Sequence, residues 1–101
     1  MDVMKMMKQA KALQAKAAQM QEELAARKYE ATSGGGAVRA TVEGSGALVG
    51  LQIDPSLLAQ GDVEMLQDLI VSAAGEASRK AKDEMQQELG KMTAGLGLPG
   101  F

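Results

Sequence analysis

Basic side chains are concentrated in the first 28 residues of this 101-residue chain, a segment without glycine or proline. They are Lys5, Lys8, Lys11, Lys16, Arg27 and Lys28. In a helix, which turns by about 100° per residue, the four from Lys5 to Lys16 fall within one broad arc. Such a row of cations can neutralise the phosphates of a polyanion and release its counterions. In an arbitrary sequence, the same row is more often a solvated helix face.

Charge is divided unevenly along the chain. Residues 1–28 hold six basic and three acidic residues, a balance of +3, whereas residues 29–101 hold five basic and ten acidic residues, a balance of −5. The net charge of −2 and the pI of about 5.1 argue against a uniformly basic surface. The local field matters more to a polyanion than the total charge. Because Glu22 and Glu23 lie beside the end of the row, we expect the positive region to comprise its first half together with Arg27 and Lys28.

The composition excludes several classes of chemistry. The chain has no His and no Cys, which rules out a His or Cys zinc site, a thiol nucleophile, a disulfide and a His-based triad. The first turn of a helix explains the acidic residues Asp62, Glu64 and Asp68, and the glycines at 34–36 lack the Gly-Lys-Ser/Thr that completes a phosphate loop. We therefore expect no catalytic residue, no metal, no cofactor and no small-molecule substrate.

The distribution of apolar residues argues against a membrane protein. The sequence has no apolar run of roughly eighteen residues, so we expect no membrane-spanning segment and no membrane partner. The beginning of the chain, in which Lys and Gln interrupt the apolar residues, does not have the pattern of a secretory signal. We expect a cytoplasmic protein.

One long helix is predicted for residues 2–28, which are rich in Ala, Met, Gln, Lys, Glu and Leu. Its apolar positions recur at alternating spacings of three and four, the pattern of a narrow heptad seam. This set, called the seam below, comprises Met6, Ala10, Leu13, Ala17, Met20 and Leu24. A seam packs against another helix, and its alanines allow a close approach. The alternative is that the seam binds a different protein, which would make the chain a helical adaptor.

Three strands are predicted between residues 29 and 53, where the apolar period changes to two. They cover residues 29–33, 38–43 and 48–53, separated by glycine-rich turns. In the third strand, Val49, Leu51 and Ile53 are expected on one face and Leu48 on the other. Short turns between the strands predict an antiparallel meander with one face covered by helix. After it, Ser56 is expected to cap a short helical turn.

A second long helix is predicted from Val63 to about Met92, with Asp62 as its N-cap. Gly75 inside it costs roughly 1 kcal/mol relative to Ala, which suggests either a close helix contact or a soft point in the helix. Gly90 and the glycines after it are expected to end the helix, and about residues 93–101 to form a flexible tail. The chain is thus predicted to be one α+β domain, residues 1–101, made of a long helix, a three-stranded meander and a long helix.

Five short runs, in order along nearly the whole chain, resemble the YbaB/EbfC family of bacterial nucleoid-associated proteins. They are Met7–Ala10 (MKQA), Met20–Glu23 (MQEE), Ile53–Leu58 (IDPSLL), Glu64–Leu69 (EMLQDL) and Leu98–Phe101 (LPGF). The resemblance implies a homodimer with a sheet-containing body and projecting helices that binds double-stranded DNA and helps to organise the nucleoid. It also adds Arg79 and Lys80, which match a basic pair common in the second helix of the family.

The resemblance favours phosphate contacts over a merely solvated face. The expected DNA contacts are Lys5, Lys8, Lys11, Lys16, Arg27 and Lys28, with Arg79 and Lys80 as weaker candidates. The chain has three arginines and two aromatic residues, so it offers few side chains that could hydrogen-bond to base edges or stack on bases. We therefore expect little sequence preference and strong salt dependence, and dimerisation would double the number of lysine rows.

Overall fold

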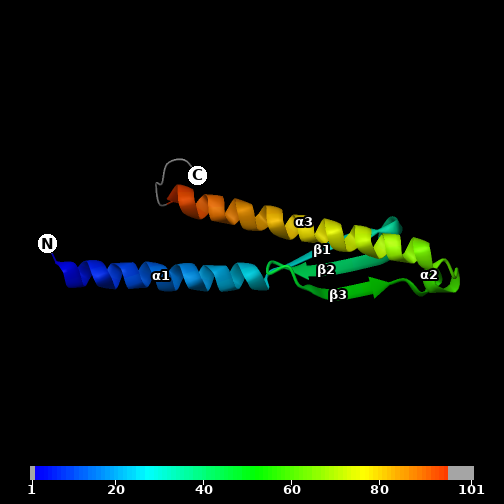
Figure 1. The fold of residues 1–101 in the computed structure, drawn as a ribbon, viewed down its shortest axis with the longest axis horizontal. Helices are drawn as coiled ribbons and strands as arrows, with labels where there is room; N and C mark the ends of the chain where they lie inside the picture. The colour runs from blue at the N-terminus through cyan, green and yellow to red at the C-terminus, as the bar shows by residue number, and fades with distance from the viewer. Residues whose placement is uncertain (1, 96–101) are drawn as a thin grey trace.

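The computed structural model describes residues 2–95 as a helix, a three-stranded sheet and a second long helix, which confirms the predicted fold class (Figure 1). The elements are α1 (Val3–Ala26), β1 (Lys28–Ser33), a 3-10 turn (Gly34–Gly36), β2 (Val38–Glu43), β3 (Leu48–Ile53), α2 (Pro55–Ala59) and α3 (Val63–Gly95). The molecule measures 73 × 24 × 16 Å, and its radius of gyration is 20.0 Å. A compact domain of this length has a radius of about 13 Å. The chain is therefore strongly elongated.

Helix α1 projects from one end of the sheet (Figure 1). Its N-cap is Asp2, whose carboxylate accepts a hydrogen bond from the Lys5 N–H at 3.2 Å. The helix ends at Ala26, two residues before the predicted end, because Arg27 is extended and Lys28 already pairs with Glu43 in the sheet. Only its last turns contact the rest of the molecule closely enough to bury a residue.

The sheet is antiparallel with the order β1-β2-β3, as predicted for a meander. A bulge in β3 changes the predicted assignment of its faces: Thr41 lies opposite Gly50, but Val42 lies opposite Leu48, so Val49 is the extra residue. Directly opposed residues share a face. Leu48 therefore lies on the same face as Leu51, and the prediction that placed them on opposite faces was wrong.

The turns follow the predicted positions but differ in one cap. All three glycines at 34–36 have positive φ, a conformation that other residues rarely adopt. The short helix α2 is capped by Asp54 instead of Ser56, because the Asp54 carboxylate accepts a hydrogen bond from the Ser56 N–H at 2.9 Å. The same hydrogen bond lowers the pKa of Asp54, since it stabilises the charged form.

Helix α3 begins as predicted and ends later. The Asp62 carboxylate accepts a hydrogen bond from the Met65 N–H at 3.0 Å, which makes Asp62 the N-cap. The helix passes through Gly90 without interruption and continues to Gly95, beyond the predicted end at Met92. Backbone hydrogen bonding along an established helix outweighs the cost of one glycine. The rest of the predicted tail, residues 96–101, lies outside the described residues.

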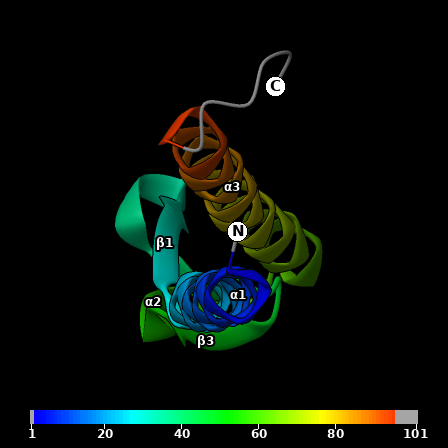
Figure 2. The same cartoon turned by 90° about the vertical axis from the view of Figure 1, so that its left-hand side faces the viewer.

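Small residues bring α3 close to the sheet. Ala73, Ala77 and Ala81 recur every four residues along the helix and are at most 2% exposed. They join two buried clusters with residues of β1 and β2, among them Ala31 and Ala40. Figure 2, seen along the long axis, shows α3 lying to one side of the sheet. The alanine row therefore fixes α3 over β1 and β2.

Two hydrogen bonds of side chains add to this attachment. The Ser33 hydroxyl donates to the Leu69 carbonyl at 2.6 Å, and the Lys80 ammonium donates to the Glu30 carbonyl at 2.9 Å. Both join β1 to α3. Within residues 2–95, no helix is both long and apolar enough to cross a lipid bilayer.

Candidate nucleic-acid interface

Four predicted contact residues form a row along the projecting part of α1. Lys5, Lys8, Lys11 and Lys16, the α1 lysine row, all have exposed side chains. Among the residues described, none of these four ammonium groups is in an ion pair; the ion pairs found involve Arg27 and Lys91 instead. Most acidic residues lie on the sheet and α3, whereas α1 itself has Glu22 and Glu23 beyond the row and Asp2 at its N-cap. The row is therefore available to an external anion.

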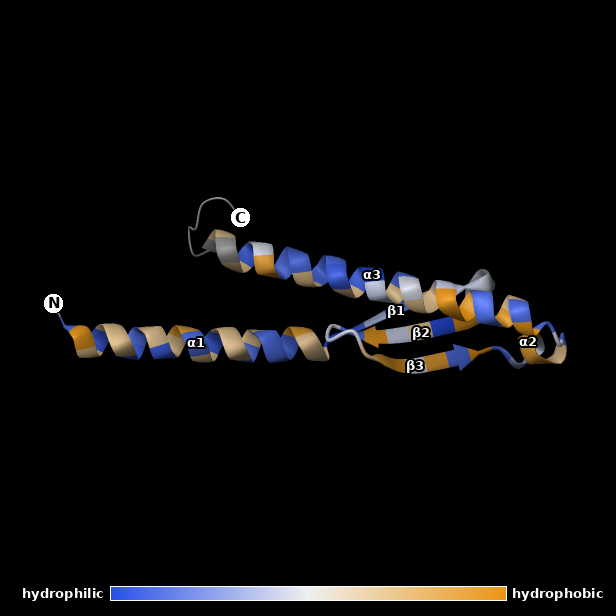
Figure 3. Cartoon of the chain, viewed as in Figure 1, coloured by the Kyte–Doolittle hydropathy of each residue, from blue (hydrophilic) through white to orange (hydrophobic). Residues whose placement is uncertain are grey.

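The seam of α1 is only partly covered in a single chain. Met6 and Leu13 are 54% and 59% exposed, while Ala17 and Met20 are half-buried and Leu24 is 3% exposed. Burial thus increases toward the end of the helix that joins the body. Figure 3 shows hydrophobic turns alternating with hydrophilic ones along the whole of α1. Over its first half, the packing of the seam against another helix stays a prediction.

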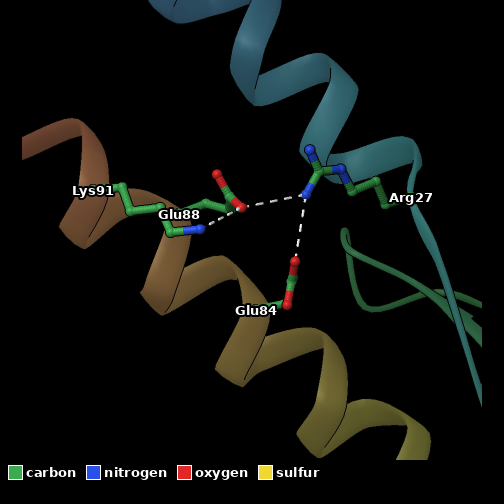
Figure 4. A network of polar contacts seen from close by, with 4 residues as sticks. All are labelled: Arg27, Glu84, Glu88 and Lys91. Atoms are coloured by element: carbon green, nitrogen blue, oxygen red, sulfur yellow. Dashed lines mark ion pairs between the residues drawn. The ribbon is translucent and has the colours of Figure 1, made fainter.

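Arg27 has partners within the protein. Its Nη1 atom lies 3.5 Å from Glu84 Oε1 and 3.6 Å from Glu88 Oε1, both on α3 (Figure 4). Lys91 Nζ lies 3.7 Å from the same Glu88 oxygen. The guanidinium is thus held between two carboxylates. The charge of Arg27 is therefore balanced by carboxylates of the protein itself, unlike the charges of the α1 lysine row.

The other predicted contacts lie apart from the row. Lys28 is exposed at the start of β1, and Arg79 and Lys80 are exposed on α3. Lys80 donates to the Glu30 carbonyl, and Arg79 folds back along its own helix, where its Nη1 atom would lie 3.5 Å from a Cβ added to Gly75. The predicted set therefore divides into one continuous row on α1 and separate cations on the body.

A model of the YbaB/EbfC DNA-binding family matches residues 1–96 of the sequence. The chain belongs to this family. The match confirms the resemblance drawn from the five short runs.

This YbaB/EbfC family member is similar in sequence to curated nucleoid-associated proteins and similar in fold to a solved structure. It is 48% identical over 101 residues to a nucleoid-associated protein of Brucella ovis, covering 99% of this chain and 94% of the relative. It is also 48% identical over 99 residues to one of Gemmatimonas aurantiaca, covering 98% and 95%. The crystal structure of an uncharacterized protein from Helicobacter pylori superposes with a TM-score of 0.73 at 28% identity, covering 91% of this chain and 97% of that one.

Three features of this family member were not found from its sequence. Glu84 and Glu88 are spaced by one helical turn, which predicts a shared face but not that Arg27 lies beside it. Gly44 approaches the end of α1, and nothing in its turn predicts that contact. The bulge at Val49, which regroups the apolar residues of β3, has no local signal either. Each depends on contacts between distant parts of the chain.

Proposed function

We propose that this protein binds double-stranded DNA through phosphate contacts from the α1 lysine row, as a nucleoid-associated protein located in the bacterial cytoplasm. The observation that carries the proposal is the row itself, exposed on a projecting helix and without carboxylate partners among the described residues. From Lys5 to Lys16 it extends for about 16 Å at about 1.5 Å per residue. One charge occurs per about 1.7 Å of duplex axis, so several phosphates lie within its reach.

Little sequence preference is expected from these contacts. Phosphate contacts fix the position of a protein on the duplex but carry no direct sequence information. Guanine is read best by arginine, and of the three arginines in the chain, Arg27 is held by two carboxylates. Lysine–phosphate attraction therefore accounts for the proposed binding without a base-reading element.

Salt dependence tests this proposal. Fluorescence anisotropy of a labelled duplex, titrated with protein at several salt concentrations, should give a log–log slope of about −3.5 for each lysine row that binds. Two duplexes of unrelated sequence should give similar affinities. A slope near zero, or binding confined to one sequence, would show that the row does not bind phosphates in the way proposed.

The proposed DNA-binding form is a homodimer that pairs through β3. Leu48, Val49 and Leu51, called the β3 surface, are 41–51% exposed although they belong to the sheet. Leu48 and Leu51 lie on the α3 side, but α3 covers β1 and β2 and leaves β3 at the open edge. Figure 3 shows this stretch as hydrophobic. A second copy that covered the β3 surface would complete the core of a small, alanine-rich domain.

Substitution of Leu51 tests the dimer. Leu51→Lys places a charge in the proposed interface and should convert dimer to monomer at micromolar concentration, as measured by sedimentation equilibrium. Val71→Lys is the matched control, because Val71 is 71% exposed on α3, away from β3. If both variants keep the mass of the wild-type protein, the β3 surface is not the interface.

The exposed first half of the seam supports a second candidate function, the binding of a helical partner protein. Such a contact would be apolar and would depend on Met6 and Leu13 instead of the lysines. Removal of the lysine charges therefore distinguishes the two functions, since it should abolish DNA binding and leave an apolar contact largely intact.

A further inference from the structure

The direction of α1 is determined at a very short junction. The helix ends at Ala26, Arg27 is its C-cap with extended backbone, and β1 begins at Lys28. A single residue thus separates the helix from the sheet. Within α1 itself, Leu24 is the one residue that is buried. Few contacts are available to fix the angle at which the helix projects.

The turn between β2 and β3 holds the backbone end of α1. The Ser45 N–H donates to the Ala25 carbonyl at 3.1 Å, and the Gly44 N–H donates to the Arg27 carbonyl at 2.9 Å. These hydrogen bonds satisfy carbonyls that the end of a helix leaves free. They fix the position of the helix end against the sheet. They do not connect α1 to α3, which runs beside it along the long axis (Figures 1 and 2).

The Arg27 side chain makes a polar connection to α3. Within residues 2–95, the two ion pairs that join separate elements are those of Arg27 with Glu84 and Glu88. The two carboxylates are one helical turn apart on α3, and in Figure 4 they converge on the same guanidinium nitrogen. An isolated exposed ion pair contributes little. Here, however, Arg27, Glu84, Glu88 and Lys91 form a network of four charges, and such a network can contribute more than an isolated pair.

We infer that Arg27 is a positioning residue, which sets the angle between α1 and α3, and is not one of the phosphate contacts. A phosphate that approached this guanidinium would lie beside two carboxylates, which repel it, whereas the α1 lysine row has no ion-pair partner in the described structure. By holding α1 at one angle to α3, Arg27 fixes the distance of the lysine row from the basic residues of α3, Arg79 among them. The expected effect on DNA binding rests on the proposed function. The expected effect on the angle between α1 and α3 does not.

A distance measurement without DNA tests the inference. The chain has no cysteine, so Gln9→Cys and Gln87→Cys, both at exposed positions of α1 and α3, introduce two unique spin-label sites. Double electron–electron resonance, with labelled chain diluted into unlabelled chain, reports the distance within one molecule. Arg27→Gln and the double variant Glu84→Gln/Glu88→Gln should both broaden the distribution and shift its mean. Arg39→Gln, which removes an exposed arginine of β2, should leave it unchanged.

A charge exchange and a DNA titration complete the test. Arg27→Glu combined with Glu84→Arg should restore a narrow distribution if the contact between the helices is what matters. DNA affinity of unlabelled Glu84→Gln/Glu88→Gln should be several-fold lower than that of Glu64→Gln/Asp68→Asn, which removes two other exposed charges of α3 and so has the same net charge, because the helix angle is no longer fixed. The inference is overturned if the distance distribution stays as in the wild type, or if Glu84→Gln/Glu88→Gln binds DNA more tightly than this charge-matched control because Arg27 has been released to phosphate. Absence of DNA binding by the wild-type protein would refute the proposed function and leave the distance result interpretable.

Discussion

Replacing all four residues of the α1 lysine row with glutamine should weaken duplex binding by at least roughly 100-fold at about 50 mM salt. The variant is Lys5→Gln/Lys8→Gln/Lys11→Gln/Lys16→Gln. Glutamine is as good a helix former as lysine, so α1 should remain helical while its phosphate partners are lost. The slope of log affinity against log salt should fall toward zero. Anisotropy titrations over a salt series measure both effects, and circular dichroism checks the fold.

Net charge must be separated from the row itself. The quadruple variant is four charges more negative than the wild type, which alone would repel DNA. A second variant therefore keeps the four glutamines and neutralises four exposed acidic residues of α3, namely Glu64, Asp68, Glu76 and Asp83. It regains the wild-type net charge of −2. If affinity returns with net charge, the attraction is a property of the whole surface and the α1 lysine row has no special part in it.

Features that depend on neighbouring residues could be predicted from the sequence. The alternation of Val38, Ala40 and Val42 predicted β2, because a strand turns successive side chains to opposite faces. Asp62 predicted the start of α3, because a cap acts within one turn. The α1 lysine row followed in the same way from the helical period, and its exposed placement on α1 agrees with that reasoning.

Features that depend on distant residues could not be predicted. Helix α1 is shorter than expected because Lys28 already lies in the sheet, opposite Glu43 of another strand. The faces of β3 were misassigned because the bulge at Val49 exists only in relation to β2. Arg27 was expected among the phosphate contacts because its charge and position fit the row. Its partners Glu84 and Glu88 come beside it only once α3 has packed on the sheet.

Replacing Gly44 with alanine should destabilise the fold by about 1–3 kcal/mol, the usual cost of inserting atoms into a packed site. An added Cβ would overlap the Leu24 carbonyl oxygen, and it would lie 3.0 Å from the Leu24 carbonyl carbon and 3.3 Å from Ala25 Cα. These are backbone atoms, which cannot rotate away as a flexible side chain does. The β2–β3 turn or the end of α1 must therefore move. Urea unfolding followed by circular dichroism measures the loss of free energy.

The same substitution should loosen the base of α1 before the protein unfolds. Displacement of Gly44 weakens its hydrogen bond to the Arg27 carbonyl and that of Ser45 to the Ala25 carbonyl. The donating amides at positions 44 and 45 should therefore exchange hydrogen faster, and so should the amides in the last turn of α1, which loses its attachment to the sheet. Ser45→Ala is the control, because it changes the next residue of the turn and retains both N–H donors. If Gly44→Ala unfolds at the same urea concentration as Ser45→Ala, with equal protection of α1, the close approach of this turn does not hold the projecting helix in place.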